Sequence, residues 1–152
     1  VYALADSKQR EFLRLSEQAD LYADAWRLLL RIEVAHQHVR FYTASQNAHR
    51  LFDAALRSAG VLHDQRVEVV RQRPGQSREA MFRFLLGGFA PDGVMLIDDS
   101  PYSVDLACSM GIRACQIRRN QLHPVASNPH CIILSSLDEL NIPLDPSWEV
   151  ML

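Results

Sequence analysis

The sequence predicts a three-layer α/β domain in which helices cover both faces of a parallel β-sheet. Short apolar stretches alternate along the chain with longer stretches of helical periodicity. This order is expected when each parallel strand is followed by a crossover helix. The segment Val94–Ile97 is apolar at every position, as in a strand buried on both faces. The chain contains no repeat or linker, and its 152 residues suit one domain, 1–152.

The first half of the chain is expected to contain two strands and two helices. A short strand at Val1–Ala5 ends in Asp6. A helix is expected over Glu17–Ile32, because apolar residues recur there at spacings of three and four. The next strand is His38–Thr43, and a second helix follows between a cap at Asn47 and a stop at Gly60.

The second half continues the alternation around Val94–Ile97. Gly111 is placed to end the helix that follows this strand. The tail, residues 141–152, contains two prolines and is expected to be irregular. The other expected elements are an edge strand at Arg66–Val70, a helix at Ser77–Phe89, a helix at Tyr102–Met110, strands at Arg113–Ile117 and Cys131–Leu134, and a short helix at Ser136–Leu140.

Composition excludes several classes of partner. The formal net charge is −2, so we expect no binding to nucleic acid or to an anionic membrane surface. No apolar run approaches the length of a membrane span. The three cysteines lack a C-x-x-C pair, which favours buried thiols in a reducing cytoplasm over a disulfide framework or a zinc site.

The pair Asp98-Asp99 is the first candidate for chemistry. It follows a buried strand directly and precedes a helix, so it should lie where open α/β sheets bind ligands. Adjacent carboxylates repel each other unless a cation lies near them, which favours a hard divalent ion such as Mg²⁺. The alternative is purely structural: the two residues form an Asx turn, with Ser100 as the N-cap of the next helix.

Several segments together resemble the haloacid dehalogenase-like (HAD) superfamily. Residues 94–112, VMLIDDSPYSVDLACSMGI, resemble its fourth motif. Residues 41–55, FYTASQNAHRLFDAA, resemble its second motif, in the TAS form of small phosphatases that act on phosphoserine tails of RNA polymerase. LYADAWRLLLRI and CIILSSLDEL resemble the helix before that motif and the last strand and helix of the fold. The resemblance covers nearly the whole chain and implies a Rossmann-like phosphohydrolase that uses Mg²⁺.

The resemblance assigns roles to individual residues. Asp6 stands at the position of the aspartyl nucleophile, which also binds the metal. Thr43 and Ala44 stand where the phosphoryl oxygens are held. The family's general acid/base is replaced by Lys8, the chain's single lysine. Because general acid-base help is typically worth ~10²–10⁴-fold in rate, we expect weak or lost hydrolysis.

Two further positions carry alternatives. The phosphate-binding lysine of the third motif would be replaced by an arginine, either Arg78, which we prefer, or Arg73. The metal ligand of the fourth motif is Asp99 in one alignment and Asp98 in the other. An additional acid common in the family would fall at Ser103, which is not acidic.

The spacing of the motifs leaves no room for a large cap domain. We expect an open site for a phosphorylated small molecule or a phosphoprotein. The other function compatible with the sequence is a catalytically degenerate HAD-like domain that serves as a binding or regulatory module, with a protein partner. The departures at Lys8, Arg78 and Ser103 favour this second reading.

Overall fold

The computed structural model describes residues 11, 14, 20–35, 37–43, 48–58, 60, 67–141 and 149–152. The strand expected at Val1–Ala5, together with Asp6 and Lys8, lies outside the described residues, as does Ala44. Their expected positions stay predictions.

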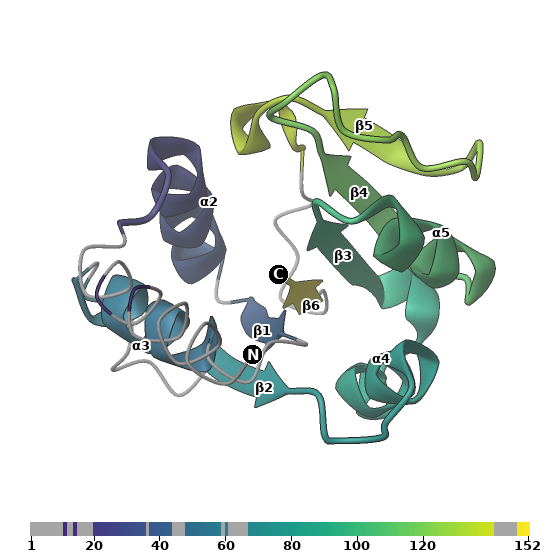
Figure 1. The fold of residues 1–152 in the computed structure, drawn as a ribbon, viewed down its shortest axis with the longest axis horizontal. Helices are drawn as coiled ribbons and strands as arrows, with labels where there is room; N and C mark the ends of the chain where they lie inside the picture. Colours follow the sequence, from purple (N-terminus) through teal and green to yellow (C-terminus); the bar gives the residue numbers. More distant parts are fainter. Residues whose placement is uncertain are drawn as a thin grey trace.

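The described part of the chain contains a six-stranded sheet in which every neighbouring pair is parallel (Figure 1). Its order is β2-β1-β6-β3-β4-β5. This arrangement confirms the expected α/β class. The strands are β1 (His38–Thr43), β2 (Val67–Arg71), β3 (Val94–Asp98), β4 (Arg113–Ile117), β5 (Ile132–Leu134) and β6 (Glu149–Met151).

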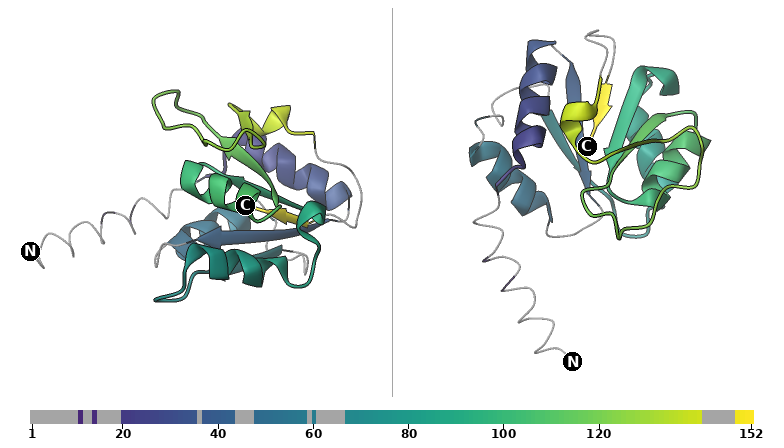
Figure 2. Two further views of the ribbon diagram at one scale, coloured as in Figure 1. Left: turned by 90° about the vertical axis from the view of Figure 1, so that its right-hand side faces the viewer. Right: turned by 90° about the horizontal axis from the view of Figure 1, so that it is seen from above.

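Helices cover both faces of this sheet (Figure 2). Each face has its own apolar core. On one face, α2 (Ala23–Val34) and α3 (Ala48–Ser58) pack with the 3₁₀ turn η2 (Leu137–Glu139). On the other, α4 (Arg78–Leu86) and α5 (Pro101–Ser109) pack against β3, β4 and β6. A second 3₁₀ turn, η1 (Pro91–Gly93), leads into β3. The three layers predicted from the sequence are therefore present.

Two serines begin the helices that flank the candidate site. Ser77 Oγ accepts a hydrogen bond from the backbone N–H of Ala80 at the start of α4. Ser100 Oγ accepts one from the N–H of Ser103 at the start of α5, with proline at the first helical position. These bonds satisfy backbone N–H groups that have no partner within the helix. They therefore set the residues at which α4 and α5 begin.

The C-terminal residues overturn one expectation. The tail was expected to be irregular, but Glu149–Met151 forms β6, which lies between β1 and β3 and pairs with both. Leu152 continues the pairing, because its N–H donates to the carbonyl of Arg40 and its carbonyl accepts from the N–H of Tyr42. Val150 and Met151 are completely buried. The three residues of β6 are too few to show a periodicity. They form a strand because β1 and β3 pair with them on both sides.

Several helix boundaries also differ from the prediction; α4, for example, ends at Leu86 rather than Phe89. The first helix begins at Ala23 rather than Glu17, because the core contact of Leu21 comes from the segment before the helix. The segment Ser136–Leu140 forms only the single 3₁₀ turn η2. A segment this short cannot recover the cost of nucleating an α-helix. Every helix in the described ranges is too short or too polar to cross a lipid bilayer.

Candidate functional site

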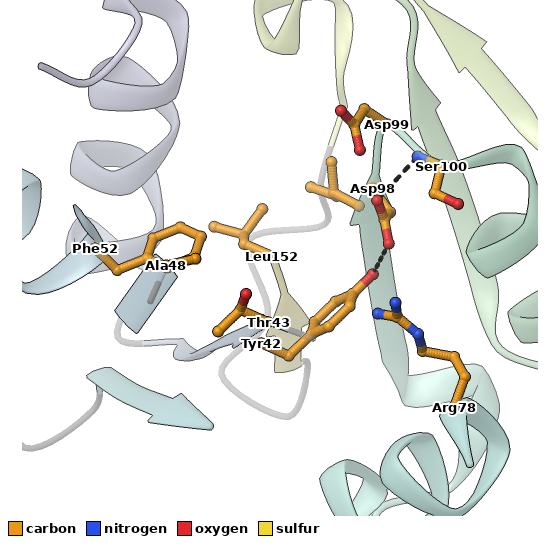
Figure 3. A pocket seen from close by; sticks show the side chains of 10 residues that line it. Tyr42, Thr43, Ala48, Phe52, Arg78, Asp98, Asp99, Ser100 and Leu152 are labelled. Atoms are coloured by element: carbon orange, nitrogen blue, oxygen red, sulfur yellow. Dashed lines mark hydrogen bonds between the residues drawn. The ribbon is translucent and has the colours of Figure 1, made fainter. Parts of the chain in front are cut away.

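A pocket of about 470 Å³ lies at the carboxyl ends of β1, β6 and β3 (Figure 3). Open α/β folds bind ligands at this edge of the sheet. Four residues predicted from the sequence meet here: Thr43, Arg78, Asp98 and Asp99. The rest of the lining consists of Tyr42, Ala48, Phe52, Ile97, Ser100 and Leu152.

The carboxylate of Asp98 is held from two sides. The phenol of Tyr42 donates a hydrogen bond to Oδ2, and the N–H of Ser100 donates to Oδ1 over 2.9 Å. The second bond is the Asx turn that the structural reading of this segment predicted. Burial, followed by the charge of Asp98, raises the pKa of Tyr42. The phenol therefore keeps its proton at neutral pH and remains a donor to Asp98.

Asp99 is the more exposed of the two acids. Its backbone is held by the buried side chain of Gln116, whose Nε2 donates to the carbonyl of Asp99 over 3.1 Å and to that of Pro124 over 2.9 Å. Desolvation, and then the proximity of Asp98, raise the pKa of the Asp99 carboxyl. A raised pKa means that the site disfavours a second negative charge, which a bound cation would relieve.

Arg78 supplies positive charge to the pocket. It is the first residue of α4, and its guanidinium carbon lies 5.8 Å from the centroid of the Tyr42 ring. In Figure 3 the guanidinium group points toward Asp98. Arg73 instead lies over the ring of Phe84 at 5.9 Å and does not line this pocket. Of the two candidate arginines, the structure thus brings Arg78 to the two acids.

Thr43 is the last residue of β1 and is buried. Its carbonyl accepts a hydrogen bond from the N–H of Gln72 over 2.9 Å, which fixes the end of the strand. Its hydroxyl lies on the same side of the pocket as the end of β6 (Figure 3). A threonine hydroxyl can donate a hydrogen bond to an oxyanion, and Thr43 lines the same pocket as the two acids.

Sequence reasoning missed the contribution of Tyr42, Gln116 and Leu152 to the site. Tyr42 and Gln116 lie inside predicted strands, and their polar atoms meet partners that are remote in sequence. Leu152 reaches the pocket only through the unexpected strand β6. One signal in the sequence could have indicated Tyr42. It is a polar residue next to the end of a buried strand, where ligands bind in this class of fold.

The donor set suits Mg²⁺ in part. Within the described ranges, no group of three or more His, Cys, Asp or Glu side chains could hold a metal ion. Mg²⁺ commonly binds through only one or two carboxylates and completes its shell with water and substrate phosphate. Asp98 and Asp99 meet that requirement. Asp99 is the better donor, because Tyr42 and Ser100 already engage both oxygens of Asp98.

Comparisons with known proteins support the fold. No family model matches the chain, and no curated protein matches its sequence. Among solved structures, the crystal structure of a dehalogenase with an intermediate complex superposes with a TM-score of 0.62 at 18% sequence identity. The match covers 79% of this chain and 54% of the other, so this chain spans about half the length of that dehalogenase. The chain therefore has an α/β fold of the haloacid dehalogenase type.

Proposed function

We propose that the pocket binds a phosphoryl group together with Mg²⁺, as the site of a HAD-like phosphohydrolase. One observation supports this most strongly. Thr43, Arg78 and the pair Asp98-Asp99 come from three separate segments of the chain and line one pocket at the carboxyl edge of the sheet. The pocket thus combines a cation for phosphate, a hydroxyl donor and two acids for a metal ion.

Each of these residues has a distinct role in the proposal. Arg78 binds two phosphoryl oxygens through its planar guanidinium group. The hydroxyl of Thr43 donates to a third oxygen. Asp99, with help from Asp98, holds Mg²⁺. When bound, the ion neutralises phosphate charge and polarises the phosphoryl oxygens.

The covalent chemistry is assigned to Asp6. Its carboxylate would attack phosphorus and form an aspartyl-phosphate while the alcohol leaves, and water would then cleave the acyl-phosphate. Lys8 stands where the family has its general acid/base, so protonation of the leaving group and activation of water would lack that help. We expect slow turnover of a phosphorylated small molecule or phosphoprotein.

A second candidate is a module that binds a phosphorylated ligand without hydrolysing it. The observation that favours it is the position of β6, which lies between β1 and β3 and ends at the pocket. β6 approaches the pocket between Thr43 and Asp98 and contributes the apolar side chain of Leu152 to the lining. Together with Lys8, this arrangement favours binding over turnover. A protein that carries a phosphorylated residue would be the partner of such a module.

Hydrolysis of an aryl phosphate with and without Mg²⁺ separates the two candidates. The phosphohydrolase requires turnover that depends on Mg²⁺ and is lost in Asp6→Asn. Asp92→Asn is a matched control, because Asp92 is an exposed acid in η1, which precedes β3. Binding of phosphate without turnover above the Asp6→Asn background supports the binding module. Turnover that is equal in the wild type and Asp6→Asn rejects the aspartyl-phosphate mechanism.

A further inference from the structure

Two cysteines outside the pocket lie in direct contact. Cys108 is in the last turns of α5, and Cys131 immediately precedes β5. Their sulfur atoms are 2.6 Å apart, although 23 positions separate them in sequence. A disulfide bond has a sulfur–sulfur length of about 2.05 Å, so only a small approach of the two side chains is needed to form one. The separation of the two sulfur atoms is therefore already close to that of a covalent link.

The surrounding hydrogen bonds hold the two cysteines in this position. Asp105 lies one turn before Cys108 on α5. Its Oδ2 accepts bonds from the N–H and hydroxyl of Ser127, at 3.0 and 2.8 Å, and its Oδ1 accepts one from the N–H of Asn128 at 2.8 Å. The carbonyl of Asn128 then accepts from the N–H of Cys131 over 3.1 Å. The loop that leads from β4 to Cys131 is thus hydrogen-bonded to α5 at Ser127 and Asn128, a few residues before Cys131.

We propose that Cys108 and Cys131 are a modification site, at which a small-molecule disulfide such as oxidised glutathione converts the two thiols to a reversible disulfide. The bond would fasten the segment 118–131 covalently to α5. This inference is independent of the proposed phosphate site.

The reaction balances as a thiol–disulfide exchange. A thiolate of the pair attacks one sulfur of the small disulfide and releases one small thiol. The second cysteine then attacks the mixed disulfide and releases the other small thiol. The protein loses two protons and two electrons, and the small disulfide gains them. Both cysteines are partly exposed, which gives the reagent access, whereas Cys115 is buried.

Contact between the two thiols also affects their ionisation. Burial, and then contact with Cys108, raise the pKa of the Cys131 thiol, and nearby Asp105 acts in the same direction. The exchange with a small disulfide can begin at either cysteine of the pair, and the other cysteine then resolves the mixed disulfide.

The segment that the disulfide would hold is connected to the backbone of Asp99 through one side chain, Gln116. The segment 118–131 includes Pro124 and Ala126. Gln116 donates to the carbonyl of Pro124 and accepts from the N–H of Ala126 over 2.9 Å, and it also holds the backbone of Asp99. A disulfide at Cys131 would therefore limit the motion of the segment 118–131. Gln116 joins this segment to the backbone of Asp99.

Peptide mapping tests the pairing directly. Trypsin cleaves after Arg and Lys, so it should place each of the three cysteines in a different peptide: 84–113, 114–118 and 120–152. The full chain is incubated with oxidised glutathione, its remaining thiols are alkylated, and the digest is analysed by mass spectrometry. We expect peptides 84–113 and 120–152 to be joined, with a loss of about 2 Da relative to the two thiols, and Cys115 to be alkylated. The joined peptide should disappear after reduction.

Other outcomes of the mapping overturn the proposal. These are alkylation of both Cys108 and Cys131 after oxidation, glutathione retained on either cysteine, or a link to the peptide of Cys115. Thermal unfolding provides a second measurement. Oxidation should raise the melting temperature by several degrees, about 5 °C or more, because the bond closes a loop in the unfolded chain. Cys131→Ser should show no such rise, and an equal rise in this variant would also reject the link.

Discussion

The phenol of Tyr42 donates a hydrogen bond to Oδ2 of Asp98, a residue 56 positions later in the chain (Figure 3). These residues belong to β1 and β3, which are not neighbours in the sheet because β6 lies between them. The bond therefore spans the end of the central strand and joins the two sides of the pocket. It fixes the orientation of one acid while leaving Asp99 toward solvent.

Removal of this bond is expected to cost stability. Tyr42→Phe keeps the ring and its edge-on contact with Phe82 but leaves Oδ2 of Asp98 without the phenol. A hydrogen bond to a charged group contributes about 1.5–3 kcal/mol, so we expect the free energy of unfolding in urea to fall by about 1.5 kcal/mol. Tyr102→Phe is a suitable control because Tyr102 is exposed. Equal stability of Tyr42→Phe and wild type would mean that the bond contributes nothing.

Asp99→Asn should separate metal binding from stability. The variant removes a carboxylate whose pKa is raised by desolvation and by Asp98, so folding should be as stable as in the wild type or slightly more stable. Mg²⁺ affinity, measured by isothermal titration calorimetry, should fall by about tenfold or more. Asp92→Asn should leave the affinity unchanged. An unchanged affinity in Asp99→Asn would remove Asp99 from the metal site.

Arg78→Gln is expected to weaken phosphate binding specifically. Loss of a charge-assisted contact of about 1.5–3 kcal/mol corresponds to about tenfold or more in the dissociation constant. Arg83→Gln is the matched control, because Arg83 lies on the same helix and pairs with Glu79 at the surface. Equilibrium dialysis with inorganic phosphate and Mg²⁺ gives both constants. Equal weakening in the two variants would indicate a general loss of charge rather than a site at Arg78.

A different acid is expected to govern stability at low pH. Asp24 is buried in α2, accepts two hydrogen bonds from Arg119 at 2.8 Å, and also accepts from Ser136 and Leu137. The bonds from Arg119 are the largest cause of its lowered pKa. Because the pKa is lower in the folded than in the unfolded chain, the contribution of Asp24 is complete above pH ~4 and is lost as the pH falls below that value.

Asp24→Asn tests this pH dependence. At pH 7 we expect its free energy of unfolding to be about 2 kcal/mol below that of the wild type. As the pH falls below about 4, the two values should approach each other, because Asp24 of the unfolded wild-type chain takes up a proton at a higher pH than Asp24 of the folded chain. The other acids titrate in both the wild type and Asp24→Asn. The difference between the two free energies of unfolding therefore reports on Asp24 alone. A difference that stays constant down to pH 2 would contradict the assignment.

The sequence predicted those parts of the fold that depend on local signals. The strand His38–Thr43 was placed at its observed boundaries, and the helix expected from Ser77 begins one residue later, with Ser77 as its N-cap. The structural interpretation of Ser100 as an N-cap is confirmed. Apolar runs and caps act within a few residues, so they can be read without knowing the partners. The meeting of Thr43, Arg78, Asp98 and Asp99 followed from the family resemblance and from the expected edge of the sheet.

Long-range pairing explains what could not be predicted. β6 has only three residues, and it is a strand because β1 and β3 provide hydrogen bonds on both sides. The Tyr42–Asp98 bond and the Cys108–Cys131 contact likewise join segments whose proximity depends on the sheet order. The expectation of buried thiols rested on an odd number of cysteines, on the absence of a C-x-x-C pair and on the expected elements. Cys115 is buried, whereas Cys108 and Cys131 are half-buried, and such local patterns carry no information on the contact between the latter two.

Calorimetric titration of the full chain with inorganic phosphate measures whether the pocket binds phosphate and Mg²⁺ together. We expect binding in the presence of Mg²⁺, much weaker binding in EDTA, and loss of the Mg²⁺-dependent part in Asp99→Asn but not in Asp92→Asn. Phosphate binding that is absent in all conditions, or identical in Asp99→Asn and wild type, would contradict this expectation.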